Sequence, residues 1–432
     1  MKNSFEINEK YAVQLDEQDP LIHFRDRFYL LDNIIYMDGN SLGLMSKDSE
    51  ESIHRVMQEW KTQAIGGWLE AKPAWFYLAE TLGAQAAQLV GAEENEVVCS
   101  GTTTINLHAL ISTFYHPQGN RTKILADELN FPSDIYALKG QIKLKGLAPK
   151  DHLVLIPGKI DDSQMLDENE IIAAMTDEIA VALFPSVLYR SGQLLDIPLL
   201  TKKAHEKGII IGFDCCHSVG GVPHQFDQWD VDFAFWCSYK YINSGPGGPA
   251  FLYMNKKHFQ KEPLLAGWFG CAKDKQFDMS LDFEYTRGAG GWQISSPSAL
   301  SAAAVQGALR IILEAGIEPI REKSIRLTEY FIFLLDHLLP SEKYNITIAT
   351  PRAPERRSGH VAIQGNSNMW RIHQALKAGG IIPDFRPPNI IRFAPIALYN
   401  TFHEIWLTVN YLKEIIDYKK YESFPAERSA IT

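Results

Sequence analysis

The sequence predicts an α/β fold, with a mainly parallel seven-stranded sheet in a large domain and a smaller C-terminal α+β domain. Between about residues 95 and 255, seven short apolar runs alternate with helix-like segments. The runs lack polar alternation, which is typical of strands buried on both faces of a parallel sheet. After residue 298 the pattern changes to long helices and a few short strands. This order of elements is that of a layered α/β domain followed by a second, mixed domain.

The seven runs are apolar throughout and have the length of strands. The segments between them read as helices; residues 199–208, for example, carry lysines at helical spacing and finish on a glycine that stops a helix. The expected strands are residues 96–100, 123–127, 152–157, 179–187, 208–214, 231–238 and 250–254.

The C-terminal third contains two long helical patterns, at 298–316 and 318–340, and a final helix at 402–421. Short strand-like pieces lie between the second and the final helix, and the Arg- and Pro-rich stretch 350–359 is expected to be an exposed, mobile loop. The predicted domains are an N-terminal segment that packs with the small domain, a large domain and a small C-terminal domain, at residues 1–65, 66–305 and 306–432.

Composition limits the classes of function. The formal net charge of −10 argues against nucleic acid or an anionic membrane as the main partner. No apolar stretch approaches the roughly 18 residues that span a bilayer. The cysteines are odd in number and most lie in apolar runs, which favours free thiols and a reducing compartment. We therefore expect a cytoplasmic protein.

Polar residues follow the apolar runs where the strands end. In an open α/β sheet, ligands bind beyond the carboxyl ends of the strands, so these residues are the candidates for a binding site. They are Ser100 to Thr104, Asp127 to Asp134, Tyr189, Asp214 with His217, and Tyr239 with Lys240.

Lys240 and Asp214 stand out in this set. A single lysine is most often a surface group, but Lys240 follows the apolar run 231–238 directly. Burial disfavours the charged ammonium, which leaves a neutral amine for Schiff-base chemistry. Asp214 ends a strongly apolar strand, where it serves as a helix cap, a backbone partner or a ligand-binding carboxylate. A metal site at "DCCH" is disfavoured because adjacent cysteines point different ways and no second ligand cluster is present.

The stretch "CSGTTTINLHAL" (99–110) reads as strand, tight turn and helix. Thr102, Thr103 and Thr104 fall at a helix N-terminus, which suits either a plain cap or a bound phosphate. The stretch lacks the lysine of a nucleoside triphosphatase loop. One cofactor uses a Schiff-base lysine, a carboxylate and a phosphate cup together: pyridoxal 5′-phosphate (PLP). Phe131 is suited to stack on its ring, or simply packs in the core.

Six motifs, in order from about residue 36 to residue 415, resemble the kynureninase family, and more closely its bacterial type. They are "MDGNSLG" (37–43), "NFPSD" (130–134), "GFDCCHSVG" (212–220), "WCSYKYINSGPGG" (236–248), "GWFG" (267–270) and "IRFAPIALYNTFHE" (391–404). The family belongs to the aspartate-aminotransferase-like group of PLP enzymes, fold type I. The resemblance thus implies that the large domain binds PLP.

The resemblance also implies roles for individual residues. Lys240 would form the Schiff base and Asp214 would pair with the pyridinium nitrogen, while Tyr239 would contact the phosphate and assist catalysis. Arg392, whose planar fork matches a carboxylate, would bind the substrate with Ser41 and Trp68. The remaining cofactor-binding residues would be Thr103, Thr104, Phe131, Asp134, His217 and, from a neighbouring subunit, Trp268 and Ser296.

The implied activity is hydrolysis of L-kynurenine, and possibly its 3-hydroxy form, to anthranilate or 3-hydroxyanthranilate and L-alanine. This reaction belongs to tryptophan catabolism, the kynurenine pathway and NAD biosynthesis. The implied assembly is a homodimer with active sites near the subunit interface. Trp68 and Ser296 stand where animal members of the family carry histidine and asparagine, which favours kynurenine over 3-hydroxykynurenine.

Two other classes of protein remain open on the sequence alone. Another enzyme of the same fold group, such as a cysteine desulfurase, a selenocysteine lyase or an aminotransferase, shares most of these residues. A desulfurase needs a mobile nucleophilic cysteine, and Cys271 is the one candidate. A non-catalytic cofactor-binding protein is disfavoured because the chain keeps both Lys240 and Arg392.

Overall fold

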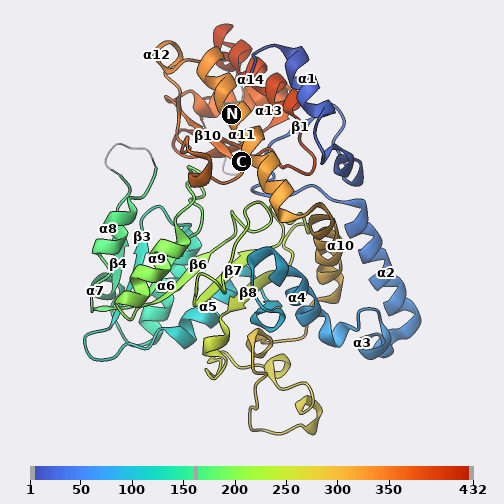
Figure 1. Ribbon diagram of the computed structural model, residues 1–432, viewed down its shortest axis with the longest axis vertical. Coiled ribbons are helices and arrows are strands. Elements are labelled where there is room, and N and C mark those ends of the chain that lie inside the picture. Colours follow the sequence, from blue (N-terminus) through green and yellow to red (C-terminus); the bar gives the residue numbers. More distant parts are fainter. Residues whose placement is uncertain (1–4, 160–163, 428–432) are drawn as a thin grey trace.

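The computed structural model describes residues 5–159 and 164–427. Figure 1 shows a large part built around a sheet and a smaller part above it, in which both ends of the chain lie. Helices α2 (Lys47–Gln63) and α10 (Ala299–Ala315) run side by side along one flank of the large part. The two parts are in contact where Arg392 of the smaller part donates to the Tyr189 carbonyl and Ser358 donates to the His217 carbonyl.

The large part contains the seven-stranded sheet that the sequence predicts. Its order is β2-β8-β7-β6-β5-β3-β4, and every neighbouring pair is parallel except the two that β8 forms. Each strand lies within one of the expected runs, so the predicted fold class is confirmed. The strands are β2 (Val97–Cys99), β3 (Lys123–Asp127), β4 (Leu153–Ile156), β5 (Ile179–Pro185), β6 (Ile210–Asp214), β7 (Phe233–Cys237) and β8 (Ala250–Met254).

Helices cover both faces of this sheet, which explains why its strands are apolar throughout. Successive side chains of a strand point to opposite faces. Accordingly, Val97 and Cys99 pack into one hydrophobic cluster and Val98 into another. The first cluster is completed by α10, α4 (Leu78–Val90) and α9 (Ile197–Glu206), and the second by α5 (Thr103–Phe114) and α6 (Pro132–Leu144).

The smaller part is an antiparallel sheet covered by helices. Its strand order is β12-β13-β10-β9, and its inner face shares one hydrophobic cluster with helix α1 (Glu9–Glu17) and three C-terminal helices. The strands are β9 (Thr347–Ile348), β10 (Val361–Gln364), β12 (Asp384–Arg386) and β13 (Ile390–Phe393), and the helices are α11 (Ile317–Leu338), α13 (Met369–Ala378) and α14 (Phe402–Asp417).

The N-terminal segment contacts both parts. Asp16 in α1 (Glu9–Glu17) accepts hydrogen bonds from the first backbone N–H groups of α14, where a negative charge favours a helix start. Strand β1 (Ile35–Tyr36) pairs in parallel with β11 (Ile381–Ile382) of the smaller part. Helix α2 instead packs on α10. The domain boundaries after residues 65 and 305 stay predictions.

The exposure expected of residues 350–359 is found only in part: Arg352 and Glu355 are exposed, whereas the end of the stretch is packed. Thr350, Arg357 and Ser358 are buried. The Arg357 guanidinium donates to Thr328 on α11 at 3.1 Å, and Ser358 donates to the backbone carbonyl of His217 at 2.8 Å. Buried polar side chains normally have hydrogen-bonding partners, and Arg357 and Ser358 find theirs within the protein. The end of this stretch is therefore packed rather than solvent-exposed.

Asp232, directly before β7, is a buried carboxylate with four hydrogen-bonding partners: His205, His258 and Lys257 side chains and the Ile211 N–H, at 2.8–2.9 Å. Burial alone would raise its pKa, but these bonds hold the pKa well below its usual value. We expect Asp232→Asn to lower the free energy of unfolding by about 2 kcal/mol near pH 7, because it leaves these donors poorly paired.

The stabilisation from Asp232 also has a defined pH dependence. A carboxyl with a depressed pKa in the folded state stabilises the protein above its unfolded pKa of about 4 and loses this contribution as the pH falls further. Urea unfolding at neutral and acidic pH measures the difference from wild type, which should shrink below about pH 4. Asp230→Asn is the matched control, since Asp230 binds Lys257 but is exposed. An equal loss in both variants would contradict this account.

Within residues 5–159 and 164–427, no single helix is long and apolar enough to cross a membrane; α10 and α11 pass that test only as a pair bent by 81°.

Candidate active site

A cavity of about 290 Å³ lies at the carboxyl ends of β3, β5, β6 and β7. Between β3 and β5 the strand order reverses, and such switch points are where α/β sheets bind ligands. Eight of the residues predicted for a cofactor site line this one cavity: Thr103, Thr104, Phe131, Asp134, Asp214, His217, Tyr239 and Lys240. Its other lining residues are Ser133, Pro185, Val187, Tyr189 and Cys216.

Lys240 reaches the cavity from the turn after β7. Its Nζ lies 3.0 Å from His217 Nε2. His217 is buried, and burial together with the positive charge of Lys240 lowers the pKa of its imidazole well below the usual value. The imidazole is therefore neutral and can exchange a proton with the lysine amine through Nε2.

The motif "MDGNSLG" approaches the backbone of this turn closely. Gly43 N–H donates to the carbonyl of Tyr239 at 2.8 Å. A side-chain Cβ at Gly43 would lie 2.6 Å from the Lys240 carbonyl oxygen and 2.1 Å from Asn243 Oδ1. Only glycine permits this approach. The motif thus holds in place the segment that carries Tyr239 and Lys240.

Two aspartates face each other in the cavity wall. Asp214, at the end of β6, accepts the Cys216 N–H at 2.8 Å. Asp134, in the first turn of α6, lies next to Asp214, and burial together with the Asp214 charge raises its pKa well above the usual value. Burial also raises the pKa of nearby Asp127 to about 7. A buried acidic cluster of this kind suits a cationic ligand group, such as a protonated ring nitrogen.

The N-terminus of α5 opens toward the same cavity. Gly101 takes a left-handed backbone conformation, φ +61°, and makes the turn from β2 into the helix. The N-cap residue, Thr102, forms no side-chain cap bond, so the N–H groups of the first turn keep their capacity to bind an anion. Thr103 and Thr104 line the cavity beside them. This donor set fits a phosphate group.

Aromatic side chains form another wall. Phe131, directly before α6, is partly exposed and meets the Tyr189 ring edge-on, with ring centroids 5.4 Å apart. Tyr239 is half-buried, and burial together with Cys237 raises the pKa of its hydroxyl, which therefore keeps its proton at neutral pH. Phe131 thus offers a ring face and Tyr239 a proton donor.

Arg392 reaches the cavity wall from the smaller part. It lies on β13, is fully buried, and donates through Nε to Asp384 at 2.6 Å. Its Nη1 donates to the backbone carbonyl of Tyr189 at 2.6 Å and its Nη2 to Ser41 Oγ at 3.2 Å. Because Tyr189 lines the cavity, the guanidinium is fixed next to it. The predicted pair of Arg392 and Ser41 is therefore close to the cofactor-site candidates.

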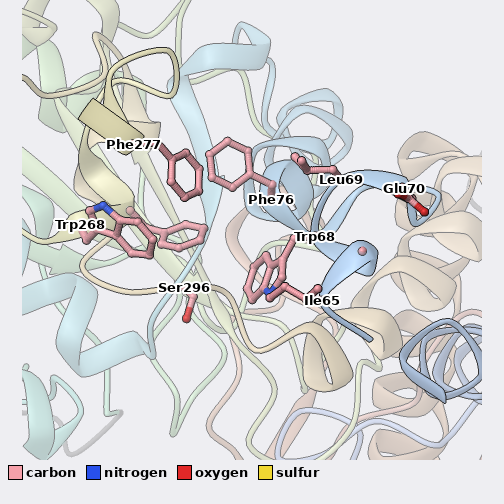
Figure 2. A pocket seen from close by; sticks show the side chains of 10 residues that line it. Ile65, Trp68, Leu69, Glu70, Phe76, Trp268, Phe277 and Ser296 are labelled. Atoms are coloured by element: carbon pink, nitrogen blue, oxygen red, sulfur yellow. The ribbon is translucent and has the colours of Figure 1, made fainter. Parts of the chain in front are cut away.

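Trp68, Trp268 and Ser296 do not line the Lys240 cavity. They line a second, largely apolar cavity of about 410 Å³, which we call the aromatic cavity. Figure 2 shows the indoles of Trp68 and Trp268 and the rings of Phe76 and Phe277 around it. The two cavities share no lining residue. Within one chain, the structure therefore separates these three residues from the other candidates.

Two residues beside the Lys240 cavity escaped the prediction. Cys216 was assigned no ligand role, although it is a lining residue. His360 is fully buried, with its ring centroid 6.2 Å from that of His217, and burial lowers its pKa to about 3. Nothing in the local sequence "SGHVAI" signals that position, because it depends on how β10 packs against the large part.

Curated proteins match this chain along its whole length. The kynureninase of Geobacillus thermodenitrificans is 52% identical over 422 residues, which cover 98% of this chain and 97% of that protein. The kynureninase of Bacillus anthracis is 50% identical over 430 residues, which cover 100% of this chain and 99% of that protein. A family model described as "Kynureninase C-terminal domain" matches residues 320–412.

Solved structures of PLP enzymes share the fold. The cysteine desulfurase of Thermococcus onnurineus NA1 aligns with a TM-score of 0.78 at 20% identity, over 91% of this chain and 98% of that chain. The lyase C-DES, solved with glycine linked to its PLP cofactor, gives 0.78 at 17% identity, over 90% and 99%. At such low identity these structures show the fold alone. The identity of about half the residues over the full length decides the family: this chain belongs to the kynureninase family.

Proposed function

We propose that the Lys240 cavity is where PLP binds and where L-kynurenine is hydrolysed to anthranilate and L-alanine. The chain has kynureninase activity and uses PLP, as its family membership implies. The observation that carries the location is the meeting of Lys240, Asp214 and the α5 N-terminus in one cavity. An amine, a carboxylate and an anion site are the three groups that PLP requires of a protein.

The residues fit the cofactor as follows. Lys240 would hold its aldehyde carbon, Asp214 its pyridinium nitrogen, and Thr103 and Thr104 its phosphate. Phe131 would lie against the ring, with Asp134 and His217 near it. When bound, PLP supplies an electron sink that stabilises negative charge at the α-carbon of the substrate. The raised pKa of Asp134 beside Asp214 supports this orientation, because a ring cation would relieve the two buried carboxyls.

The chain's own groups would move the protons. The Lys240 amine, 3.0 Å from the neutral His217 imidazole, is placed to take the proton from the α-carbon and to return it. Tyr239 keeps its proton at neutral pH and would donate to the γ-carbonyl oxygen as water adds there. Cleavage of the β–γ carbon bond then releases anthranilate and leaves the three-carbon fragment as alanine.

Substrate recognition would divide between the two cavities. Arg392 and Ser41 would bind the α-carboxylate at the Lys240 cavity. Trp68, Trp268 and Ser296 would belong to the active site of a second copy, in a homodimer. The aromatic cavity supports this, since Trp268 is half exposed and Ile65 is 81% exposed in the single chain. Trp68 and Ser296 would then favour kynurenine over 3-hydroxykynurenine. The five free cysteines support a cytoplasmic location.

One assay separates the proposal from a desulfurase. Incubation with L-kynurenine should release fluorescent anthranilate and an equal amount of alanine, whereas incubation with L-cysteine should release no sulfide. Cys271→Ala should stay within about twofold of wild type, since Cys271 lines neither of the two cavities assigned here. Sulfide release that disappears in Cys271→Ala, with no anthranilate formed, would replace this function by cysteine desulfuration.

A further inference from the structure

Two cysteines are in contact beside the Lys240 cavity: Cys216, which lines it, and Cys237. Strands β6 and β7 are parallel neighbours, with Asp214 opposite Phe235. Cys237 is the last residue of β7, and Cys216 lies two residues after the end of β6. The Cys237 N–H donates to Cys216 Sγ at 3.3 Å, and Cys237 Sγ lies 4.0 Å from the Cys216 carbonyl oxygen. The strand register and these two contacts bring the two thiols together.

The backbone spacing suits a disulfide. Neighbouring strands lie about 4.8 Å apart, and disulfides join residues whose Cα atoms are about 4–7 Å apart. Cys216 lines the Lys240 cavity, whereas both thiols are buried from the outer surface. Small molecules that enter the cavity therefore have access to the pair. Of the other cysteines, Cys99 and Cys215 are buried and Cys271 is partly exposed.

The two thiols also differ in acidity. Burial and the hydrogen bond with Cys237 raise the pKa of Cys216. Burial alone would raise the pKa of Cys237 too, but the bond from Cys216 and the positive charge of Lys240 lower it below the usual value. A more acidic thiol beside a less acidic one is the arrangement in which a nucleophile has its resolving partner at hand.

We propose that Cys216 and Cys237 form a redox-active dithiol, which a peroxide oxidises to a disulfide when the cavity holds no cofactor. The thiolate sulfur attacks one peroxide oxygen, the O–O bond breaks, and hydroxide leaves with a sulfenic acid formed. The second sulfur attacks that sulfur, the S–O bond breaks, and the displaced hydroxide takes the thiol proton as water. The hydroxide of the first step takes the proton that the attacking thiol gave up, so two thiols lose two electrons and hydrogen peroxide becomes two waters.

That a bound cofactor protects the two thiols from peroxide rests on the proposed function, whereas the formation of the disulfide does not. A ligand that fills the cavity lies between the solvent and Cys216. Oxidation would also join the chain two residues after Asp214 to the chain two residues before Tyr239, both of which line the cavity, and so change the cavity before a cofactor enters. The oxidised, cofactor-free protein should therefore bind PLP more weakly until a thiol reductant restores it.

The test uses full-length Cys271→Ala protein, in which the partly exposed thiol is absent. Cofactor-free and PLP-loaded samples are treated with hydrogen peroxide, the remaining thiols are alkylated in denaturant, and the peptides are mapped by mass spectrometry. In the cofactor-free sample we expect a peptide pair joined through Cys216 and Cys237, and dithiothreitol should separate it. With PLP at about ten times its dissociation constant, formation of the Cys216–Cys237 disulfide should be about tenfold slower.

Variants supply the controls. Cys216→Ser and Cys237→Ser should each abolish the joined pair, whereas Cys215→Ser should keep it. If Cys216→Ser or Cys237→Ser folds poorly, the presence or absence of the Cys216–Cys237 cross-link in the Cys271→Ala protein decides by itself whether the dithiol forms. Full alkylation of Cys216 and Cys237, under conditions that oxidise Cys271 in wild type, would overturn the proposal; so would a link between Cys215 and Cys216. Equal rates with and without PLP would leave the dithiol in place but contradict the cofactor position proposed above.

Discussion

Replacing Lys240 with alanine should lower kcat/KM for L-kynurenine by about 10⁴-fold. The substitution removes the amine that would hold the cofactor and the group placed to move the α-proton, and general acid–base catalysis alone is worth about 10²–10⁴-fold. The His217 imidazole loses its partner at 3.0 Å. Steady-state formation of anthranilate measures the loss. The unfolding temperature should change little, because Lys240 is only partly buried.

Lys203→Ala is the matched control for this variant. Lys203 lies on α9, is partly exposed, and binds the neighbouring Glu206. Its loss should leave kcat/KM within about twofold of wild type. A Lys240→Ala protein that keeps more than about a tenth of the activity would mean that another amine performs this chemistry.

Replacing Arg392 with lysine should raise KM for L-kynurenine and lower kcat/KM by about 100-fold, with a smaller change in kcat. The guanidinium donates to Asp384, to the Tyr189 carbonyl and to Ser41 at once. A lysine ammonium is a point charge and cannot hold these partners and a carboxylate in one plane. Binding that is lost equally in the ground state and the transition state appears in KM. Initial rates over a range of substrate concentration separate the two parameters.

Arg386→Lys is the control for charge alone. Arg386 also donates to Asp384, at 2.8 Å, but it lies a third exposed at the edge of the sheet. This change should alter kcat/KM by less than about threefold. If Arg386→Lys and Arg392→Lys had equal effects, or if Arg392→Lys lowered kcat with KM unchanged, the role of Arg392 as the carboxylate clamp would be wrong.

The sequence predicted the fold and most of one cavity because the signals were local. The apolar runs gave all seven strands of the large sheet, and the polar residues after them converge as parallel strand ends must. Lys240 and Asp214 could be identified because a charged residue directly after a buried strand is rare. Their predicted chemical roles are open to the tests above.

The rest depended on tertiary packing. Arg357 lies in a stretch rich in arginine and proline, yet it is fully buried because its guanidinium finds partners on α11. The separation of Trp68 and Trp268 from Lys240 follows from the course of the chain before β2 and after β8, which no motif records. The pairing of Cys216 with Cys237 needs the β6–β7 register, which is a property of the folded sheet.

The central claim is that Lys240 holds the cofactor, and chemical reduction tests it most directly. Treating the PLP-loaded protein with borohydride fixes the cofactor on the lysine that carries it, and peptide mapping identifies that residue. We expect the reduced adduct on Lys240 alone, with the yellow colour lost irreversibly, and no lysine adduct in Lys240→Ala protein. An adduct on another lysine of the wild-type protein, or a reducible lysine adduct that persists in Lys240→Ala, would contradict the account.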